Sequence, residues 1–408
     1  MKKNYTERSK YLKYFLFLYI LAISSFEYFF RASNEATYLL FPFVAFGFYY
    51  YNKKINVLFI KIILAFLVAF FLQSILYGSP IYFVITLFFR FLTIYFSVSI
   101  IGKNFVKIFI QTIKIFSIIS LIFYGLQHFN FILNFLLSFS ENFTNLNSDI
   151  SILADRPNFI IYTIQTLTQD NSTFYRNSGP FFEPGLFAVF LNIVLALNLA
   201  KSRSVFNKTN ILFIVVLITT FSTMGYIVLF MNLTLFGIYS KSIKLKYRIL
   251  LVCLLVLSIP TLISISFIGD KMQDQFNDSD VSYSRFGAAV VHWNIIKDYP
   301  ITGLPYDETT YSKYADNISP NGITEIFLRF GVIAGFIYYV FLFKASSKMI
   351  KMFGNKKKGL GLFLVLTPVL FSETQGNKPI YWAIIFSQIP LSNYLIKWKI
   401  FQRNKHLI

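Results

Sequence analysis

The chain consists of long apolar runs that are separated by short polar connections. Hydrophobic residues make up 56% of the 408 residues and charged residues only 14%, which is too apolar for a soluble globular domain. A helix needs about 20 apolar residues to cross a bilayer. The runs therefore predict a single polytopic membrane domain over residues 1–408, all-α, with about 12 transmembrane helices. They cover residues 14–30, 37–51, 55–77, 80–101, 105–126, 180–200, 209–221, 223–240, 248–268, 322–343, 359–373 and 377–396.

The positive charges are distributed between the connections in a regular way. The formal net charge is +20, but lysine and arginine punctuate the apolar runs and do not form one basic face, which excludes a nucleic-acid partner. Most of them fall in alternate connections, among them Lys53 and Lys54, then Lys103 and Lys107. Because basic loops stay on the cytoplasmic side, the pattern predicts a multi-pass protein with cytoplasmic N- and C-termini.

Residues that build metal or cofactor sites are scarce in the sequence. The single cysteine, Cys253, lies in an apolar run, and His128, His292 and His406 are too scattered for a zinc motif. The sequence has neither a nucleotide-binding loop ending in Gly-Lys-Ser or Gly-Lys-Thr nor a His-Glu metalloprotease pair. We therefore expect the protein to use no metal and no cofactor.

Two connections are far longer than the others, and the charge pattern places both on the outer side. They cover residues 127–179 and 269–321, and long loops in compact proteins usually carry function. In the first loop, residues 157–168 are expected to form a surface helix. In the second, Ser284 is a candidate cap for a helix from Arg285 that residues 298–300 end. Arg285 and His292, seven residues apart, would share one face of this helix.

An irregular segment leads into the sixth apolar run. Residues 176–185 read Arg-Asn-Ser-Gly-Pro-Phe-Phe-Glu-Pro-Gly and place two charges where water meets the bilayer, a depth at which charges are functional by default. An arginine fork suits phosphate, so Arg176 and Arg285 are candidate phosphate ligands, with lipid headgroups or loop carboxylates as the alternative partners. Glu183 is a candidate general base, or otherwise a carboxylate favoured at the start of a helix.

Two charges lie deep inside predicted spans. Arg90 is near the middle of the run 80–101, and Lys114 is at a similar depth in the run 105–126. At that depth a side chain must face the bundle interior, because lipid offers no partner for its charge. We expect the two residues either to bind an anionic lipid head or to pair with polar groups of neighbouring helices.

The run 322–343 begins with a cluster of polar residues. Glu325 and Arg329 are four residues apart, so on a helix they either pair with each other or bind substrate from one face. Asn321 is a candidate substrate ligand, or simply the N-cap of this helix. His292 carries the same two interpretations, as a substrate ligand or as an ordinary residue on a helix face.

Three of these segments resemble the O-antigen polymerase and ligase superfamily of polytopic bacterial glycosyltransferases. Residues 176–185 are similar to the Arg, Gly and Glu-Pro-Gly pattern of capsule and O-antigen polymerases. Arg285 with residues 300–303 (Pro-Ile-Thr-Gly) resembles the large-loop arginine and Pro-x-x-Gly ending. Asn321, followed by Gly331 and Gly335, resembles the ligase signature. Pro320 occupies the histidine position of that signature, which favours a polymerase.

The resemblance implies a GT-C-like fold, a location in the bacterial inner membrane, and a lipid substrate. Undecaprenyl-diphosphate-linked oligosaccharide repeat units would be joined at the outer face, with inversion at the anomeric carbon and without metal. Arg176 and Arg285 would stabilise the diphosphate while Glu183 deprotonates the acceptor hydroxyl. Membrane lipid and a chain-length regulator protein are the further partners that it implies. The remaining candidates would bind substrate: Arg90, Lys114, His292, Asn321, Glu325 and Arg329.

Two alternative functions use similar features. A ligase would transfer the finished polymer from the same carrier to a lipid acceptor and would need nearly the same arginines. A lipid-linked oligosaccharide flippase would also need cations inside the bundle, but it should show two related halves. The sequence has no such internal repeat, which favours an enzyme over a flippase.

Overall fold

The structure is a computed structural model whose described elements are almost all helices. Its helices and strands are α1 (Lys2–Ser25), α3 (Ser33–Tyr50), α4 (Val57–Tyr77), α5 (Ile81–Ile101), η1 (Gly102–Asn104), α6 (Phe105–Leu126), α7 (Asn130–Thr144), β1 (Ile164–Gln169), β2 (Ser172–Asn177), α8 (Pro184–Lys201), α9 (Lys208–Thr219), α10 (Thr223–Ile238), α13 (Arg285–Asp298), α14 (Glu308–Tyr311), α15 (Gly322–Lys351), α16 (Gly359–Ser372) and α17 (Pro379–Lys405). The structure describes residues 2–26, 33–144, 157–169, 172–202, 204–205, 207–238, 246, 249, 253, 285–305, 308–313, 321–354, 359–372 and 376–405.

The helices follow the apolar runs closely. Each predicted span that falls within the described residues is helical, and the span 248–268 lies outside them apart from isolated positions. Among the described residues, four helical stretches are long and apolar enough to cross a membrane, and three shorter apolar helices accompany them. The four are Val57–Tyr77, Ile81–Leu126, Pro184–Lys201 and Gly322–Lys351. The chain is thus an all-α assembly compatible with a helical membrane protein.

Large apolar side chains cover the outside of the bundle. Phe43 of α3 is 75% exposed and Val68 of α4 is 56% exposed, and both helices present further exposed aromatic and aliphatic residues. Water-soluble proteins rarely expose apolar surface on this scale, whereas lipid tails accommodate it. The outer surface therefore agrees with a membrane-embedded protein.

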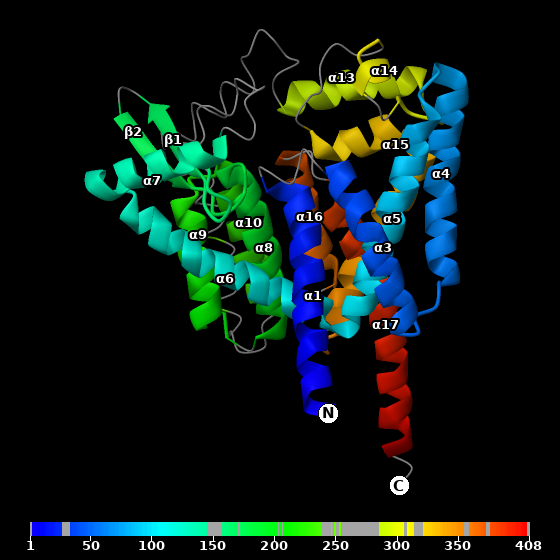
Figure 1. The fold of residues 1–408 in the computed structure, drawn as a ribbon, viewed down its shortest axis with the longest axis horizontal. Coiled ribbons are helices and arrows are strands. Elements are labelled where there is room, and N and C mark those ends of the chain that lie inside the picture. The colour runs from blue at the N-terminus through cyan, green and yellow to red at the C-terminus, as the bar shows by residue number, and fades with distance from the viewer. Residues whose placement is uncertain are drawn as a thin grey trace.

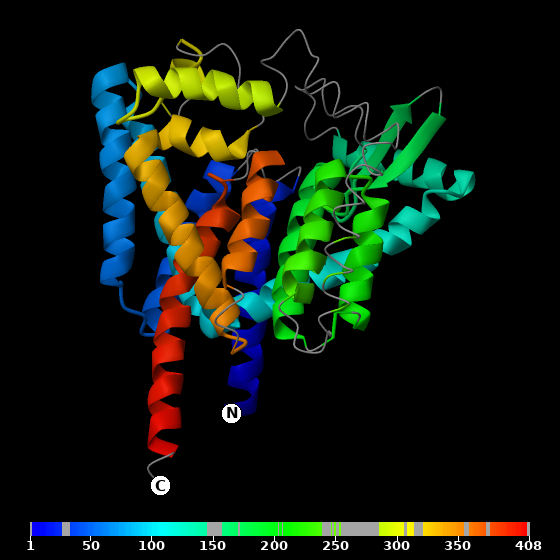
Figure 2. The ribbon, with the colours of Figure 1, turned by 180° about the vertical axis from the view of Figure 1, so that it is seen from behind.

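The two ends of the molecule differ in what they carry. Figure 1 shows both termini at one end, and the β1–β2 hairpin, α13 and α14 at the opposite end. The hairpin packs on α6 and α9, whereas α13 packs on α15. Figure 2 shows the same division from behind, with α13 lying across the first part of α15. The two long loops thus contribute their described parts to one end of the bundle.

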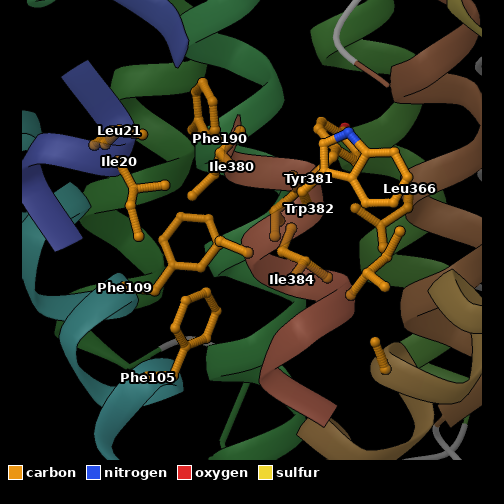
Figure 3. Packing of buried hydrophobic residues seen from close by; sticks show 14 of the residues in the cluster. Ile20, Leu21, Phe105, Phe109, Phe190, Leu366, Ile380, Tyr381, Trp382 and Ile384 are labelled. Carbon is orange, nitrogen blue, oxygen red and sulfur yellow. The ribbon is translucent and has the colours of Figure 1, made fainter. Parts of the chain in front are cut away.

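Helix α8 lies at the centre of the core. Every residue from 186 to 200 is buried, as expected of a helix that is apolar all round and enclosed by others. Its polar residue Asn192 donates to the carbonyls of Ala188 and Gly225 and accepts from Asn232 of α10. Figure 3 shows the neighbouring aromatic core, where Phe109 and Phe190 lie beside α17. Interhelical amide bonds of this kind hold helices together where the surroundings are apolar.

The expectation of a surface helix over residues 157–168 is wrong. Residues 164–169 form strand β1, which pairs antiparallel with β2, so that Ile164 faces Asn177 and Gln169 faces Ser172. Ile164 is buried against Tyr162 and Leu136. The β-branched residues Ile164, Thr166 and Thr168 favour a strand over a helix.

Helix α15 is broken at Gly331, where a loop segment takes over its hydrogen bonds. Gly331 has φ 75° and ψ 170°, so the helix bond from Val332 to Leu328 cannot form. Instead the Val332 amide donates to the carbonyl of Pro300, and the Leu304 amide donates to the carbonyl of Leu328. The nitrogen–oxygen distance is 2.7 Å in both bonds. Gln73 of α4 adds bonds to the carbonyls of Thr302 and Arg329. We call residues 300–304 the clip.

The clip explains why glycine occupies position 331. A side chain there would collide with the carbonyl oxygen of Ile301, and the backbone is left-handed. Gly354 has nearly the same φ, 76°, but no atom lies within 4 Å of where its side chain would be. Both positions have a positive φ, but Gly331, with ψ 170°, lies in a region that almost only glycine adopts and would also collide, whereas Gly354 would meet no neighbouring atom.

We expect Gly331→Ala to destabilise the protein much more than Gly354→Ala. The Gly354 variant should lose about 1–2 kcal/mol, the left-handed penalty alone. The Gly331 variant adds displacement of the clip and should lower the melting temperature of the purified protein clearly further. Equal melting temperatures for the two variants would show that the clip does not hold the kink.

Candidate functional site

Helices α13 and α15 bring five of the predicted site residues together. Arg285 and His292 lie on α13, and Asn321, Glu325 and Arg329 lie on the first part of α15. The break at Gly331 makes this possible, because it turns the first part of α15 across the end of the bundle and under α13 (Figures 1 and 2). Two helices that follow each other along the chain, with α14 between them, thus form one layered unit.

Asn321 joins the starts of the two helices. Its side-chain oxygen accepts hydrogen bonds from the amides of Ile323 and Thr324, which caps α15 as the sequence predicts. Its side-chain nitrogen donates to the carbonyl of Arg285 over 3.0 Å. Asn321 is fully buried. It therefore fixes the position of the backbone from which the half-buried Arg285 side chain projects.

His292 is a buried imidazole between the two helices. Its Nδ1 lies 2.8 Å from the hydroxyl of Thr324, and the residue is 1% exposed. Burial, and then the nearby positive charge of Arg329, lower the pKa of His292 from its ordinary value of 6.5 to about 4. At neutral pH the ring is therefore neutral. It connects the helices through hydrogen bonding and adds no positive charge to the site.

Arg329 is buried beneath the second loop. Its guanidinium donates to the carbonyl of Pro305 over 2.8 Å and lies 3.9 Å from the ring centre of Tyr311. Such a cation–π contact gains strength where water is excluded. Burial raises the pKa of the Tyr311 hydroxyl, so it stays protonated. Sequence reasoning missed Tyr311, because nothing in its local pattern distinguishes it from the other tyrosines of the chain.

Glu325 does not pair directly with Arg329, contrary to one of the two expectations. Its Oε1 accepts from the Asn377 side chain over 3.3 Å, while Arg329 turns to Pro305. Each instead lies within electrostatic range of the other. Among the residues that the structure describes, Glu325 Oε2 and Arg329 Nε have no hydrogen-bond partner. A buried polar atom in this state costs about 1–3 kcal/mol, so the pair favours a polar ligand nearby.

Arg176 is placed by strand β2 at the end of helix α9. Its Nε donates to the carbonyl of Thr220 and one terminal nitrogen donates to the carbonyl of Phe221, with a distance of 3.1 Å in both bonds. The carbonyls at a helix C-terminus carry partial negative charge, which a cation stabilises. Arg176 therefore has a structural role in holding the α9–α10 turn. That role fixes the guanidinium at the hairpin end of the molecule.

The segment from Arg176 to helix α8 is a rigid turn. Asn177 donates to the hydroxyls of Ser120 and Thr219, and Gly179, at φ 54°, lies against the ring of Phe187. Phe181 stacks on Phe187 and on Phe190. These contacts leave little freedom for the residues that follow.

Glu183 is the N-cap residue of α8, but its carboxylate does not cap the helix. Its backbone is extended, at φ −151° and ψ 155°, and the side chain makes no hydrogen bond to the first turn. Pro184 at the first helical position has no amide N–H, so the first turn has one fewer donor without a partner. Glu183 is half-buried. Its carboxylate is therefore available to a ligand at the rigid turn.

The two mid-span cations have different surroundings. Arg90 of α5 is 7% exposed and lies near Tyr19 of α1, inside the bundle as expected. Lys114 of α6 is exposed, so the expectation that it faces the interior is not what the structure shows. It shares the exposed side of α6 with Ile115 and Ile118. The physical reason is that α6 lies at the margin of the bundle, so depth along a helix does not determine which side is enclosed.

The predicted residues thus form two groups at the end opposite the termini. One group is the α13–α15 unit with Arg285, and the other is the turn with Arg176 and Glu183. Figure 1 shows the hairpin and α13 at different positions across this end of the molecule. Arg90 and Lys114 belong to neither group.

The chain was also compared with known proteins. No protein-family model matches it, and no curated protein matches its sequence. A family assignment therefore rests on the three short segments named above. Two of them, residues 300–303 and the segment from Asn321 to Gly331, are in direct contact through the clip.

We expect the stability of the protein to fall on mild acidification because of His292. The pKa of His292 is lower in the folded chain than in the unfolded chain. Its contribution to the free energy of unfolding is therefore complete above about pH 6.5 and is lost below that value, because the unfolded chain then gains a proton that the folded chain does not. The loss should reach about 1 kcal/mol by pH 5.5. Thermal unfolding at pH 7.5 and pH 5.5 measures it.

The matched variants are His292→Gln and His128→Gln. Glutamine at 292 can still bond Thr324 but cannot titrate, so the melting temperature of this variant should fall less between the two pH values. His128 is exposed, so its replacement should leave the acid sensitivity unchanged. Identical acid sensitivity in wild type and His292→Gln would contradict the assignment.

Proposed function

We propose that the protein is a polysaccharide polymerase, which joins undecaprenyl-diphosphate-linked oligosaccharide repeat units at the outer face of the bacterial inner membrane. The observation that supports this best is the α13–α15 unit. It combines a half-buried arginine, whose backbone Asn321 holds, with buried polar atoms that have no partner among the described residues, at the end of the molecule away from both termini. A diphosphate group and sugar hydroxyls are ligands of matching chemistry.

The proposal includes a topology. About 12 helices cross the membrane, the termini are cytoplasmic, and α13, α14 and the hairpin are extracytoplasmic. In this arrangement the clip and the first part of α15 lie where the lipid carrier presents its diphosphate. The fold is proposed to be GT-C-like, as the resemblance implies.

In the proposed reaction an acceptor hydroxyl attacks the anomeric carbon of the donor sugar. A bond forms between that oxygen and the carbon while the bond from the carbon to the diphosphate oxygen breaks. The electron pair leaves with the diphosphate, and the hydroxyl proton passes to Glu183. One direct displacement inverts the anomeric carbon. Arg285 and Arg176 would stabilise the charge that develops on the diphosphate, which is usually the largest catalytic contribution. The lipid-linked ligand would therefore have to span the two groups of residues, which lie at different positions across this end of the molecule.

The remaining residues of the α13–α15 unit hold Arg285, the second loop and the substrate in position. Asn321 holds the Arg285 backbone, and Arg329 anchors the loop that contains Pro305 and Tyr311. The unpartnered oxygen of Glu325 would accept a hydrogen bond from a sugar hydroxyl. His292 stays neutral at working pH and does not repel Arg329. Arg90 is assigned a supporting role inside the bundle.

We expect Arg285→Ala to stop polymer formation while leaving the protein folded. Removal of one preorganised donor to a developing negative charge costs about 100- to 1,000-fold in rate. Arg285→Lys keeps the charge but loses the fork and should retain partial activity. Chain length in a strain that carries each variant, together with the pool of lipid-linked repeat units, is the measurement.

The product that accumulates separates the candidate functions. Single lipid-linked repeat units at the outer face support a polymerase. Finished lipid-linked polymer supports a ligase, and repeat units held at the inner face support a flippase. Wild-type chain lengths in both Arg285→Ala and Arg176→Ala would refute the diphosphate site.

We also expect Glu183→Gln to slow polymerisation about 100- to 10,000-fold, because the amide cannot take the acceptor proton. Glu35→Gln is the matched control, since Glu35 is an exposed carboxylate in the first turn of α3. It should leave polymer length unchanged. Full activity of Glu183→Gln would remove Glu183 as the base.

A further inference from the structure

The end of the molecule that carries the termini has two neighbouring cavities lined by lysines. The larger, of about 620 Å³, lies between the α3–α4 connection, the end of α5 and η1, and α17, and contains Lys53, Lys54 and Lys103. The smaller, of about 220 Å³, lies between α1 and α6 and contains Lys10, Lys13 and Lys107. We call them the larger and the smaller basic cavity.

The two cavities form one electrostatic unit around the η1 turn. Gly102 has φ 65° and allows the sharp turn from α5 into η1. Lys103 then lines the larger cavity and Asn104 the smaller one. Lys13 lies within electrostatic range of both Lys53 and Lys103. Six ammonium groups are thus collected near one turn.

Among the side chains that the structure describes, no aspartate or glutamate lines either cavity. Like charges collected in this way repel each other and destabilise the folded state unless an anion joins them. A helix end can stabilise one or two basic residues by its dipole. Lys53 lies at such an end, since its backbone amide donates to the carbonyl of Phe48 at the end of α3. The dipole does not account for lysines contributed by four separate elements. The preference of basic residues for the cytoplasmic side places lysines at this end, but it does not require that six of them line two neighbouring cavities.

The wall of the larger cavity is fixed in place. The hydroxyl of Tyr95 accepts from the Asn56 amide and donates to the Lys54 carbonyl, and its ring stacks on Phe59 with 3.9 Å between centres. The ammonium of Lys103 lies 5.1 Å from the ring centre of Tyr394 on α17. The cavity is therefore organised before a ligand arrives, which lowers the cost of binding.

We propose that the larger basic cavity binds a phosphate group of an anionic ligand, with the headgroup of an anionic phospholipid as the favoured source. Its volume falls within the range of about 300–1,000 Å³ that is typical of small-molecule sites. Basic pockets between membrane helices bind anionic headgroups in this way, and Tyr394 and Ile389 offer apolar surface beside the lysines. The proposal is independent of the polymerase proposal, because the site lies at the opposite end.

The test compares Lys53→Gln/Lys103→Gln with the matched control Lys201→Gln/Lys208→Gln. Both double variants lose two exposed lysines, and Lys201 and Lys208 line neither cavity. Each protein is placed in nanodiscs of phosphatidylcholine with increasing phosphatidylglycerol. The melting temperature then reports an apparent affinity for the anionic lipid. A second arm adds inorganic phosphate or pyrophosphate to discs of phosphatidylcholine alone.

We expect phosphatidylglycerol to stabilise the wild type and the control equally. The cavity variant should need about 25-fold more of it, roughly fivefold for each lysine removed. Stabilisation by soluble phosphate that the cavity variant loses would identify a soluble phosphate compound as the ligand. Equal behaviour of the two double variants in both arms would overturn the proposal.

A folding defect in the variant is detected separately. The melting temperature in phosphatidylcholine alone shows whether the two replacements damage the fold. If they do, Lys54→Gln/Lys103→Gln replaces the first variant, since Lys54 lines the same cavity and is exposed. This variant should lose affinity for phosphatidylglycerol by the same factor, about 25. An unchanged affinity would again overturn the proposal.

Discussion

The break in α15 and the clip that fills it are the feature on which the candidate site depends. A helix that stops at Gly331 leaves a carbonyl and an amide without partners, and inside a membrane protein such groups must be satisfied by other protein groups. The clip supplies both partners, and Gln73 supplies a third bond from α4. The first part of α15 is therefore held across the end of the bundle, where it supports α13. Without this arrangement Asn321 could not reach Arg285.

Buried charge in the site is stabilised by several partners of different kinds. Arg329 uses a carbonyl and an aromatic face, and Glu325 uses one amide. Direct pairing would have left a neutral, self-contained pair, but in the described part of the chain the separated arrangement leaves Glu325 Oε2 and Arg329 Nε without a hydrogen-bond partner. Buried charges are costly in a low-dielectric interior. Their retention here is the physical argument for a ligand.

Much of the fold follows from local sequence signals. The apolar runs predict the helices, and the Pro300 boundary and the Asn321 cap predict the end of α13 and the start of α15, because these signals act over a few residues. The clip could not be predicted, since a glycine inside a helical run reveals a break only once its distant partner is known. Lys114 shows the same limit, because depth along a run does not tell which side of a helix is enclosed. The hairpin was missed because the apolar residues of its first strand, Ile164 and Leu167, are three positions apart, a spacing that suits a helix better than a strand.

The central claim is that arginines from both long loops meet a lipid-linked diphosphate at the end opposite the termini. A cryo-electron microscopy structure of the protein in lipid nanodiscs with a non-hydrolysable undecaprenyl diphosphate sugar tests this most directly. The account predicts phosphate density within hydrogen-bond distance of the Arg285 guanidinium, with Arg176 facing the same ligand and Glu183 close to the anomeric carbon. Density for the diphosphate away from both arginines, or at the end that carries the termini, would contradict it.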